Sequence, residues 1–356
     1  MNIFDALAAR QHEQVVFGQD AASGYRGIIA IHSTARGPAL GGTRFWSYAN
    51  EDDAFTDALR LSRAMTYKAA AAGLPLGGGK SVILAPAGTP SPEARERILR
   101  AHGRLVETLG GRYIAGEDVG TGQSELAVIR KETRHVAGVA AAVNDPSPWT
   151  ALGVRRGIQA ALQHRFGSDS LQGKTVAIQG CGQVGYRLAR ELHALGAQLI
   201  VSDVSPLRAQ RVVVECEARA VEPETILAAK VDVLAPCALG GVFDDRTIPA
   251  LECAVVAGSA NNQLLEDRHG DALAARGILY APDYVVNAGG LVSGAMELFG
   301  WSEEDVRRGV EGIYDTTTSV FQAAAKDGVP PSRAADRLAE ERLRAAGEDR
   351  RAAAAT

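Results

Sequence analysis

The sequence contains little that points to disulfide or metal chemistry. Its four cysteines lie singly, without the CxxC or Cys/His spacing of a zinc site or a disulfide framework, at Cys181, Cys216, Cys237 and Cys253. We therefore expect reduced, mostly structural cysteines and no metal site. Cys237, within Pro-Cys-Ala-Leu-Gly-Gly, stays a candidate nucleophile, although free cysteines are more often small buried hydrophobes.

Excess positive charge and long apolar runs are also missing. The chain has 38 Lys and Arg against 42 Asp and Glu, a net charge of -4, which gives no basic footprint for nucleic acid. No run approaches the ~18 apolar residues needed to cross a bilayer, and the first ten residues lack the apolar region of a signal peptide. We expect a cytoplasmic protein that binds neither nucleic acid nor membranes.

The length indicates more than one domain. At 356 residues the chain exceeds what a single core usually supports. We expect an α/β fold with two domains around a deep cleft. The first, an α/β substrate domain at 1–147, is completed by a C-terminal helix at about 332–356. The second, at 148–331, is a doubly wound α/β domain, and the turn-rich segment 145–148 suits a hinge between them.

In the first half, clusters of β-branched and apolar residues predict strands at 13–19, 25–34 and 80–86. The segment 50–72 predicts a helix with Asn50 as its N-cap. Its apolar positions recur at helical spacing, at Ala54, Ala58, Leu61 and Met65. Lys68 continues this stripe, so its ammonium must either reach along the surface to water or point into a cleft.

In the second half, strands alternate with helices, which predicts a parallel, doubly wound sheet. The expected strands are 175–180, 198–203, 231–235, 253–257 and 278–281, with a helix at 184–195 after the first. Mostly helical sequence follows residue 290, and a charged helix at 332–348 precedes an Ala-rich tail that we expect to fray.

A glycine-rich turn in the second half has the features of a dinucleotide site. Gly180, Gly182 and Gly185 form a GxGxxG between a predicted strand and a predicted helix, so that the helix N-terminus can face a pyrophosphate. Asp203 ends the next strand at a suitable interval to bind an adenosine ribose. Because a carboxylate at Asp203 repels a 2′-phosphate, the motif favours NAD over NADP. We therefore expect the second domain to be a Rossmann-type NAD-binding domain.

The first half holds a second glycine-rich segment with charged residues near it. Lys80 follows Gly77-Gly78-Gly79, Lys68 precedes it by a dozen residues, and Asp118 follows Gly116-Glu117. Two lysines and an aspartate near glycine-rich backbone suit a site that holds an anionic substrate and moves protons on it at neutral pH.

The chain resembles the glutamate/leucine/phenylalanine/valine dehydrogenase family over nearly its whole length, closest to the leucine-specific members. The matching segments, in order, are HEQVVFGQD, GPALGGTR, ALRLSRAMTYK, LGGGKSV, GRYIAGEDVG, PCALGG, AGSANNQL, YAPDYVVNAGG and AADRLAEER. The resemblance implies NAD-dependent, reversible deamination of an L-amino acid to a 2-oxo acid and ammonia, without a metal, in a homo-oligomer.

The resemblance also implies roles for individual residues. Lys68 matches the lysine that binds the substrate carboxylate, and Asn262 matches a side chain that helps to fix the substrate. Lys80 matches the catalytic base, whose pKa we expect a neighbouring lysine and burial to lower, and Asp118 matches the second proton-transfer residue. The remaining implied contacts are backbone near the substrate at Gly41 and Gly42, and NAD contacts at Thr150, Gln183, Val184, Ala260 and Asn287.

The expected side-chain pocket leaves the substrate open. By resemblance its lining is Leu40, Gly116, Leu291 and Gly294. Leucine enzymes typically have alanine at the position of Gly116, valine at that of Gly294 and a small aliphatic residue at that of Trp149. Overall similarity favours a branched-chain substrate, whereas these departures favour phenylalanine or tryptophan. Glutamate is disfavoured, since the lining offers no cation.

Two other classes of function are weighed against this interpretation. A hydroxy-acid dehydrogenase needs a histidine/carboxylate pair, and none is evident beside either glycine motif. We therefore interpret His32, His102 and His135 as structural. A noncatalytic NAD-binding homologue is the other alternative, and the presence of Lys68, Lys80 and Asp118 together argues against it.

Overall fold

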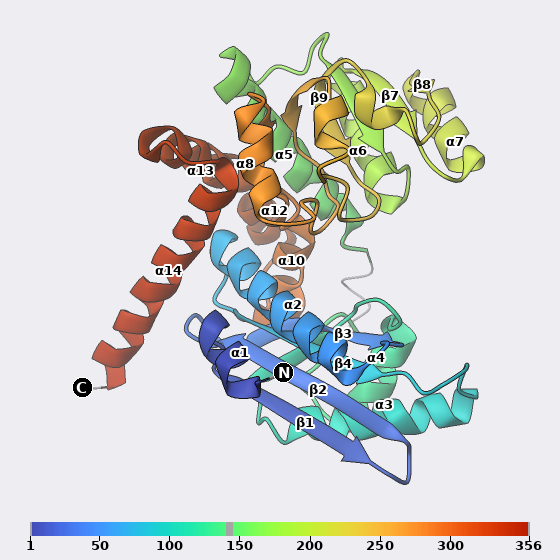
Figure 1. The fold of residues 1–356 in the computed structure, drawn as a ribbon, viewed down its shortest axis with the longest axis vertical. Helices are drawn as coiled ribbons and strands as arrows, with labels where there is room; N and C mark the ends of the chain where they lie inside the picture. The colour runs from blue at the N-terminus through green and yellow to red at the C-terminus, as the bar shows by residue number, and fades with distance from the viewer. Residues whose placement is uncertain (1, 140–144, 355–356) are drawn as a thin grey trace. The chain divides into compact units, whose positions relative to one another are not determined.

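The structure is a computed structural model that describes residues 2–139 and 145–354. The chain divides into two compact units, each built around its own sheet (Figure 1). Unit 1 contains Met1–Asn144, Glu297–Gly300 and Ala339–Thr356. Unit 2 contains Asp145–Met296 and Trp301–Leu338.

Unit 1 has a five-stranded mixed sheet in the order β1-β2-β4-β3-β5. Strand β2 is antiparallel to β1 and β4, whereas β3 is parallel to its neighbours β4 and β5. The register pairs Gly42 with Gly116 across β3 and β5, and Thr43 with Ser81 across β3 and β4. The strands are β1 (Gln14–Asp20), β2 (Tyr25–Ser33), β3 (Ala39–Trp46), β4 (Gly77–Leu84) and β5 (Tyr113–Gly116).

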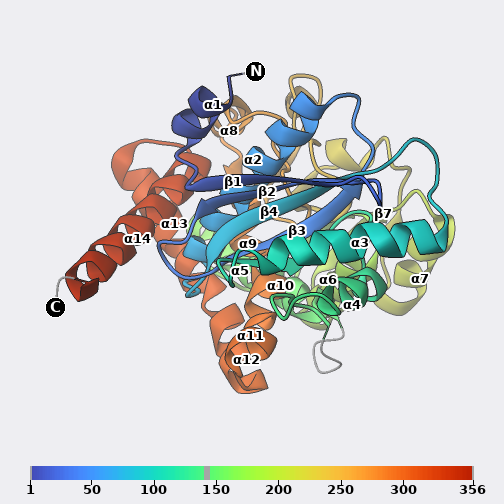
Figure 2. The ribbon, with the colours of Figure 1, turned by 90° about the horizontal axis from the view of Figure 1, so that it is seen from below.

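Helices cover both faces of this sheet, and Figure 2 shows the strands between α2 on one side and α3 and α4 on the other. One core layer joins α2 to the sheet through Ile28, Phe55 and Val82. The opposite layer contains Leu99 and Leu126. The helices are α1 (Ile3–Arg10), α2 (Glu51–Ala71), α3 (Pro92–Glu107) and α4 (Gln123–Arg130).

Helix α2 begins as the sequence predicts. The side chain of Asn50 accepts a hydrogen bond from the backbone N–H of Asp53 at 2.9 Å, and three acidic residues occupy the first turn. The predicted apolar stripe faces the sheet, with Ala54, Ala58 and Leu61 buried. Lys68 lies in the last turn and is half-buried.

Unit 2 has a six-stranded parallel sheet in the order β11-β10-β9-β6-β7-β8, so the predicted doubly wound fold is confirmed. The strands are β6 (Thr175–Gln179), β7 (Gln198–Ser202), β8 (Arg219–Ala220), β9 (Val231–Pro236), β10 (Cys253–Val256) and β11 (Leu279–Tyr280). Its core includes Val176, Ile178, Val201 and Val233 from the strands.

The remaining elements connect or cover this sheet. They are α5 (Ser147–Phe166), α6 (Gln183–Ala194), α7 (Pro206–Cys216), the short helices η1 (Ile226–Ala228) and η2 (Ile248–Ala250), α8 (Arg268–Ala275), α9 (Asp283–Val286), α10 (Gly289–Ser293), α11 (Ala295–Phe299), α12 (Glu303–Glu311), α13 (Ile313–Asp327) and α14 (Pro331–Ala354). The last helix continues to Ala354, so the expectation that the tail frays from Arg351 is wrong for the described residues.

Two strands of unit 1 were not predicted. Strand β3 contains Gly41 and Gly42, and such glycines usually weaken a strand. Here the sheet requires them, because a Cβ atom on Gly41 would lie 1.8 Å from the carbonyl oxygen of Gly79. Strand β5 has only four residues, too few for a clear alternating pattern. The strand predicted at 80–86 instead begins at Gly77, because the three glycines before Lys80 pair with β2 and β3.

Candidate active site

The carboxyl-terminal halves of β3 and β5 and the middle of β4 bring the glycine-rich segments of unit 1 together around Lys80. A Cβ atom on Gly42 would lie 3.1 Å from Nζ of Lys80 and 2.7 Å from Cβ of Asp118. The Lys80 side chain is therefore packed against bare backbone. It is 5% exposed, which removes its amine almost entirely from water.

Lys80 and Asp118 form an ion pair, as neighbouring catalytic residues would. Nζ of Lys80 lies 2.9 Å from Oδ2 of Asp118, although 38 residues separate them. Asp118 follows β5, and its backbone N–H donates to the hydroxyl of Thr121 at 3.2 Å. That hydroxyl in turn donates to the carbonyl of Thr43 on β3. The loop that carries Asp118 is thus tied to the strand beside Lys80.

The structure adds charged residues that the sequence analysis missed. Arg44 on β3 donates from Nε to Oδ2 of Asp118 at 2.7 Å, and from an Nη atom to Oδ2 of Asp57 at 2.7 Å. The hydroxyl of Tyr48 also donates to Asp57, at 2.8 Å. Arg44 stands two residues after Gly42, and this spacing along an extended strand is the one signal that could have placed it on the same face.

The burial and the charges of this cluster alter its protonation. Burial lowers the pKa of Lys80; Asp118 opposes this shift and Arg44 adds to it. Burial would raise the pKa of Asp118, but Lys80 and Arg44 together bring it below its ordinary value. The lowered pKa expected for Lys80 is confirmed in direction. Burial is its main cause, and Arg44 is a contributing like charge that the sequence did not indicate.

Lys68 lies on a helix that packs closely against the strand of Lys80. A Cβ atom on Gly78 would lie 2.0 Å from the backbone nitrogen of Thr66, so α2 and β4 touch two residues away from each lysine. This contact requires glycine at 78. It places the last turn of α2, with half-buried Lys68, beside the glycine-rich strand.

Two predicted pocket residues of unit 1 lie on adjacent strands. Leu40 is 7% exposed on β3, and Gly116 ends β5. A Cβ atom on Gly116 would have the carbonyl oxygen of Gly41, 3.8 Å away, as its nearest neighbour, so there is room for a side chain. Leu291 and Gly294 lie at α10 in unit 2, where a Cβ atom on Gly294 would meet the carbonyl of Leu291 at 3.2 Å.

The second glycine motif forms the turn between β6 and α6. Gly180 has a φ of +98°, a conformation that favours glycine. A Cβ atom on Gly185 would lie 1.9 Å from the Gly180 carbonyl oxygen, whereas one on Gly182 would meet nothing within 4 Å. The helix therefore packs tightly on the turn, and open space lies in front of its N-terminus, whose first N–H groups belong to Gln183 and Val184. This arrangement fits a dinucleotide pyrophosphate.

Asp203 lies where a ribose-binding carboxylate is needed. Its Oδ2 accepts a hydrogen bond from the backbone of Cys181 within the glycine turn at 2.7 Å, and its Oδ1 accepts one from Ser205 at 2.8 Å. The negative charge thus sits at the end of β7 beside the turn, as the preference for NAD requires.

Other predicted cofactor contacts lie on the loops that follow β10 and β11. Asn287 is 3% exposed; its amide donates to the carbonyl of Ser259 at 3.0 Å and to the side chain of Asn261 at 2.9 Å. Its Oδ1 is buried and has no partner among the described residues. Such an acceptor suits a carboxamide N–H of a bound nicotinamide. Ala260 is buried near Asn287. Thr150 lies instead in α5, where its hydroxyl donates to the carbonyl of Pro146.

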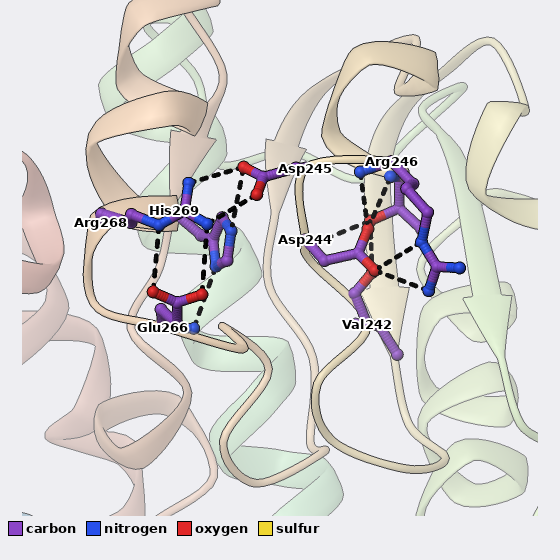
Figure 3. A network of polar contacts seen from close by, with 8 residues as sticks. Val242, Asp244, Asp245, Arg246, Glu266, Arg268 and His269 are labelled. Atoms are coloured by element: carbon purple, nitrogen blue, oxygen red, sulfur yellow. Dashed lines mark hydrogen bonds and ion pairs between the residues drawn. The ribbon is translucent and has the colours of Figure 1, made fainter.

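A polar network holds two loops beside this region, and Figure 3 shows its residues. Arg268 forms two hydrogen bonds to the carboxylate of Asp245, each at 2.6 Å, and also donates to Glu266. The N–H of Glu266 donates to Nδ1 of buried His269 at 2.9 Å. The network joins the loop after β9 to the start of α8. Asn262, between them, has a left-handed φ of 52°.

The histidines and cysteines have structural surroundings. His32 is buried and bonded to Thr66, and His102 to Tyr25, each at 2.9 Å. His135 lies 3.9 Å from Glu107. All four cysteines are free, and burial raises the pKa of Cys237, which argues against the nucleophile considered above.

In residues 2–139 and 145–354 there is no group of three or more His, Cys, Asp or Glu side chains that could hold a metal ion. The helices of the same residues include none long and apolar enough to cross a membrane.

Comparison with known families gives matches in both units. The family described as "Glu/Leu/Phe/Val dehydrogenase, dimerisation domain" matches residues 12–135, and "Glutamate/Leucine/Phenylalanine/Valine dehydrogenase" matches residues 206–351. Residues 148–238 match "D-isomer specific 2-hydroxyacid dehydrogenase, NAD binding domain". This last match covers the glycine turn and Asp203, and so agrees with their assignment to a dinucleotide.

Individual relatives cover nearly the whole chain. Leucine dehydrogenase from Thermoactinomyces intermedius is 52% identical over 96% of this chain and 94% of its own length. L-tryptophan dehydrogenase from Nostoc punctiforme is 47% identical over 96% of each chain. The crystal structure of L-tryptophan dehydrogenase from Nostoc punctiforme aligns with a TM-score of 0.88 and 45% identity, covering 97% of this chain and 100% of that one.

Proposed function

Because this chain belongs to the Glu/Leu/Phe/Val dehydrogenase family, we propose that it reversibly deaminates a hydrophobic L-amino acid, with a branched-chain amino acid preferred. That it is an NAD-dependent amino acid dehydrogenase follows from its relatives and its NAD-binding match. The observation that carries the proposed chemistry is the buried ion pair between Lys80 and Asp118, packed against the backbone of Gly42. In this proposal unit 1 supplies Lys68, Lys80 and Asp118, and unit 2 binds NAD.

The cofactor would be held by the glycine turn, by Asp203 at the ribose and by Asn287 at the carboxamide. When bound, NAD would supply the hydride acceptor for the substrate α-carbon, and loss of the hydride would leave the substrate as an iminium. The protein must hold the substrate carboxylate meanwhile. Lys68 supplies the cation for this role and Asn262 a polar side chain, while Gly41 and Gly42 present backbone groups near the substrate.

Proton transfer belongs to Lys80 and Asp118. As a neutral amine, Lys80 takes a proton from the water that attacks the iminium carbon. Before the hydride leaves, the Asp118 carboxylate takes a proton from the substrate ammonium, and it returns this proton to the nitrogen of the resulting carbinolamine. The C–N bond then breaks to give the 2-oxo acid and ammonia, while the hydroxyl proton of the carbinolamine passes to Asp118. Burial favours the step at Lys80, because it lowers the pKa of Lys80 and so favours its neutral amine.

A branched-chain substrate is supported by the 52% identity to a leucine dehydrogenase and by Leu40 in the expected pocket. The second candidate is an aromatic amino acid. It is favoured by the open space at Gly116, where the nearest atom to an added Cβ is 3.8 Å away, and by the tryptophan dehydrogenase likeness. A homo-oligomer is also proposed, because residues 12–135 match a domain described as a dimerisation domain.

The deciding experiment is ammonium-dependent oxidation of NADH, with 4-methyl-2-oxopentanoate, phenylpyruvate and indolepyruvate compared by kcat/KM. The proposal expects the branched 2-oxo acid to have the highest value. A higher value for an aromatic 2-oxo acid would overturn the branched-chain preference, and the absence of ammonium-dependent turnover with all three would overturn the activity.

The catalytic base is tested in the same assay with Lys80→Ala. Because a general base contributes roughly 10²- to 10⁴-fold, we expect kcat to fall by at least about 10²-fold while NADH still binds. Lys131→Ala is the matched control, since Lys131 is an exposed lysine paired with Glu96. Unchanged turnover in Lys80→Ala would contradict the assignment.

A further inference from the structure

Two cationic side chains of unit 1 contact the same carboxylate oxygen. Oδ2 of Asp118 lies 2.9 Å from Nζ of Lys80 and 2.7 Å from Nε of Arg44. Arg44 is thus in contact with the carboxylate partner of the proposed base, although it comes from a different strand. The three side chains are largely buried, with 6%, 20% and 19% of the Lys80, Arg44 and Asp118 side chains exposed.

A second carboxylate holds Arg44 from the opposite direction. Asp57 of α2 accepts from an Nη atom of Arg44 at 2.7 Å and from the Tyr48 hydroxyl at 2.8 Å, through the same oxygen. Its other oxygen accepts from Arg60 at 3.1 Å. Charges therefore alternate along a chain of contacts in the order Asp57, Arg44, Asp118, Lys80.

We propose that Arg44 is a positioning residue for the deamination: it fixes the Asp118 carboxylate, and its permanent charge favours the neutral amine of Lys80, while Asp57 moderates that charge. This inference rests on the proposed function, in which Lys80 is the base and Asp118 its partner.

The physical need for Arg44 follows from the ion pair itself. A lone carboxylate at 2.9 Å stabilises the ammonium form of Lys80, which cannot act as a base. Arg44 cannot give up its proton, so it holds part of the hydrogen-bonding capacity of Asp118 at every working pH. It also places a like charge near Lys80. Both effects oppose the hold of Asp118 on the lysine proton.

The pKa directions agree with this geometry. Burial lowers the pKa of Lys80 and Asp118 raises it; Arg44 is a further influence that lowers this pKa, and Asp57 is one that raises it. The groups that face the cluster are Asp118 after β5, Arg44 on β3, Asp57 on α2, and the tyrosines 48 and 113; Lys68 lies on the same helix as Asp57. Both tyrosines have raised pKa values, mainly through burial, and stay neutral.

A purely structural role for Arg44 makes a different prediction. If Arg44 only joined β3 to α2 through Asp57, its removal would lower stability and rate but would leave the pH at which activity develops unchanged. The pH dependence of kcat/KM therefore separates the two roles.

The experiment compares Arg44→Met, Arg44→Lys and Asp57→Asn with the wild-type enzyme in oxidative deamination across pH 6 to 11. Arg44→Met removes the cation, so the acidic limb of kcat/KM should move to higher pH by about one unit or more. Arg44→Lys restores the charge without the planar fork, so it should return the limb toward wild type with a lower kcat. Asp57→Asn leaves Arg44 less neutralised, so its limb should move to lower pH.

Arg60→Met is the matched control, because Arg60 contacts Asp57 but not Asp118 and its side chain is 52% exposed. It should leave the limb in place. The inference is overturned if the acidic limb of kcat/KM lies at the wild-type pH in both Arg44→Met and Asp57→Asn. If Arg44→Met does not fold, the direction of the Asp57→Asn shift decides. A wild-type enzyme without ammonium-dependent turnover, or an unchanged limb in Lys80→Ala, would instead overturn the proposed function.

Discussion

Gly42 leaves room for Lys80: a Cβ atom on this glycine would lie 3.1 Å from the lysine Nζ. It would also lie 2.5 Å from the carbonyl oxygen of Glu117, which cannot move without moving Asp118. The glycine is needed for close approach rather than for an unusual backbone conformation, because Gly42 lies within β3. The position of the proposed base therefore depends on a missing side chain on the neighbouring strand.

Gly42→Ala should disable the enzyme without unfolding it. The added methyl group displaces Lys80 or the Asp118 loop by a fraction of an ångström to about 1 Å, and a misplacement of that size can cost roughly 10²-fold in rate. The measurement is kcat for NADH formation together with thermal unfolding. Gly347→Ala is the control, since a Cβ atom at Gly347 on α14 meets nothing within 4 Å. Wild-type kcat in Gly42→Ala would contradict this account of the site.

Asp203→Asn should weaken the discrimination between NAD and NADP. The substitution keeps a side-chain oxygen that can accept from Cys181 or Ser205 but removes the charge that repels a 2′-phosphate. We expect the ratio of kcat/KM for NAD over that for NADP to fall by roughly 10-fold, with most of the change in KM. An unchanged ratio would show that the adenosine ribose does not meet Asp203.

Gly116→Ala should narrow the range of substrates. The methyl group enters open space 3.8 Å from the Gly41 carbonyl, so the fold should tolerate it. If Gly116 lines the pocket, lost volume should penalise larger side chains by roughly 1–3 kcal/mol. The kcat/KM ratio of indolepyruvate to 4-methyl-2-oxopentanoate should then fall at least about 5-fold. An equal effect on both 2-oxo acids would place Gly116 outside the side-chain pocket.

His102 should make the protein less stable in mild acid. Burial lowers its pKa from 6.5 to about 3, so the unfolded chain binds a proton that the folded chain does not. The contribution of neutral His102 to the free energy of unfolding is present above pH 6.5 and is lost as the pH falls toward about 3. At pH 5 the loss is about 2 kcal/mol.

The variant His102→Asn keeps an acceptor for the Tyr25 hydroxyl but cannot be protonated. Urea unfolding at several pH values between 7 and 5 should show that the free energy of unfolding falls less steeply with falling pH than in wild type, by about 1 kcal/mol per pH unit on average. Equal slopes would mean that His102 is not neutral in the folded protein. His32, whose pKa burial also lowers to about 3, still contributes in the variant.

The second half of the fold could be predicted well because its signals are local. Each strand is a short apolar run between turn residues, and the GxGxxG of Gly180 to Gly185 marks a strand, a turn and a helix within a dozen residues. Asp203 follows from the same local unit, since it comes directly after the next strand. The first half was less predictable, because β3 owes its extended form to pairing with β4 and β5 rather than to its own composition.

The chemical groups can be read from the chain alone: an amine at Lys80, carboxylates at Asp118 and Asp203, and glycines in two short segments. No local pattern shows that Arg44 and Lys80 contact the same oxygen of Asp118, or that Asp57 on a helix pairs with Arg44. Arg44 and Asp118 are 74 residues apart, so strand register and helix packing bring them together. Burial, the main cause of the lowered pKa of Lys80, likewise arises from the assembled layers and belongs to no single segment.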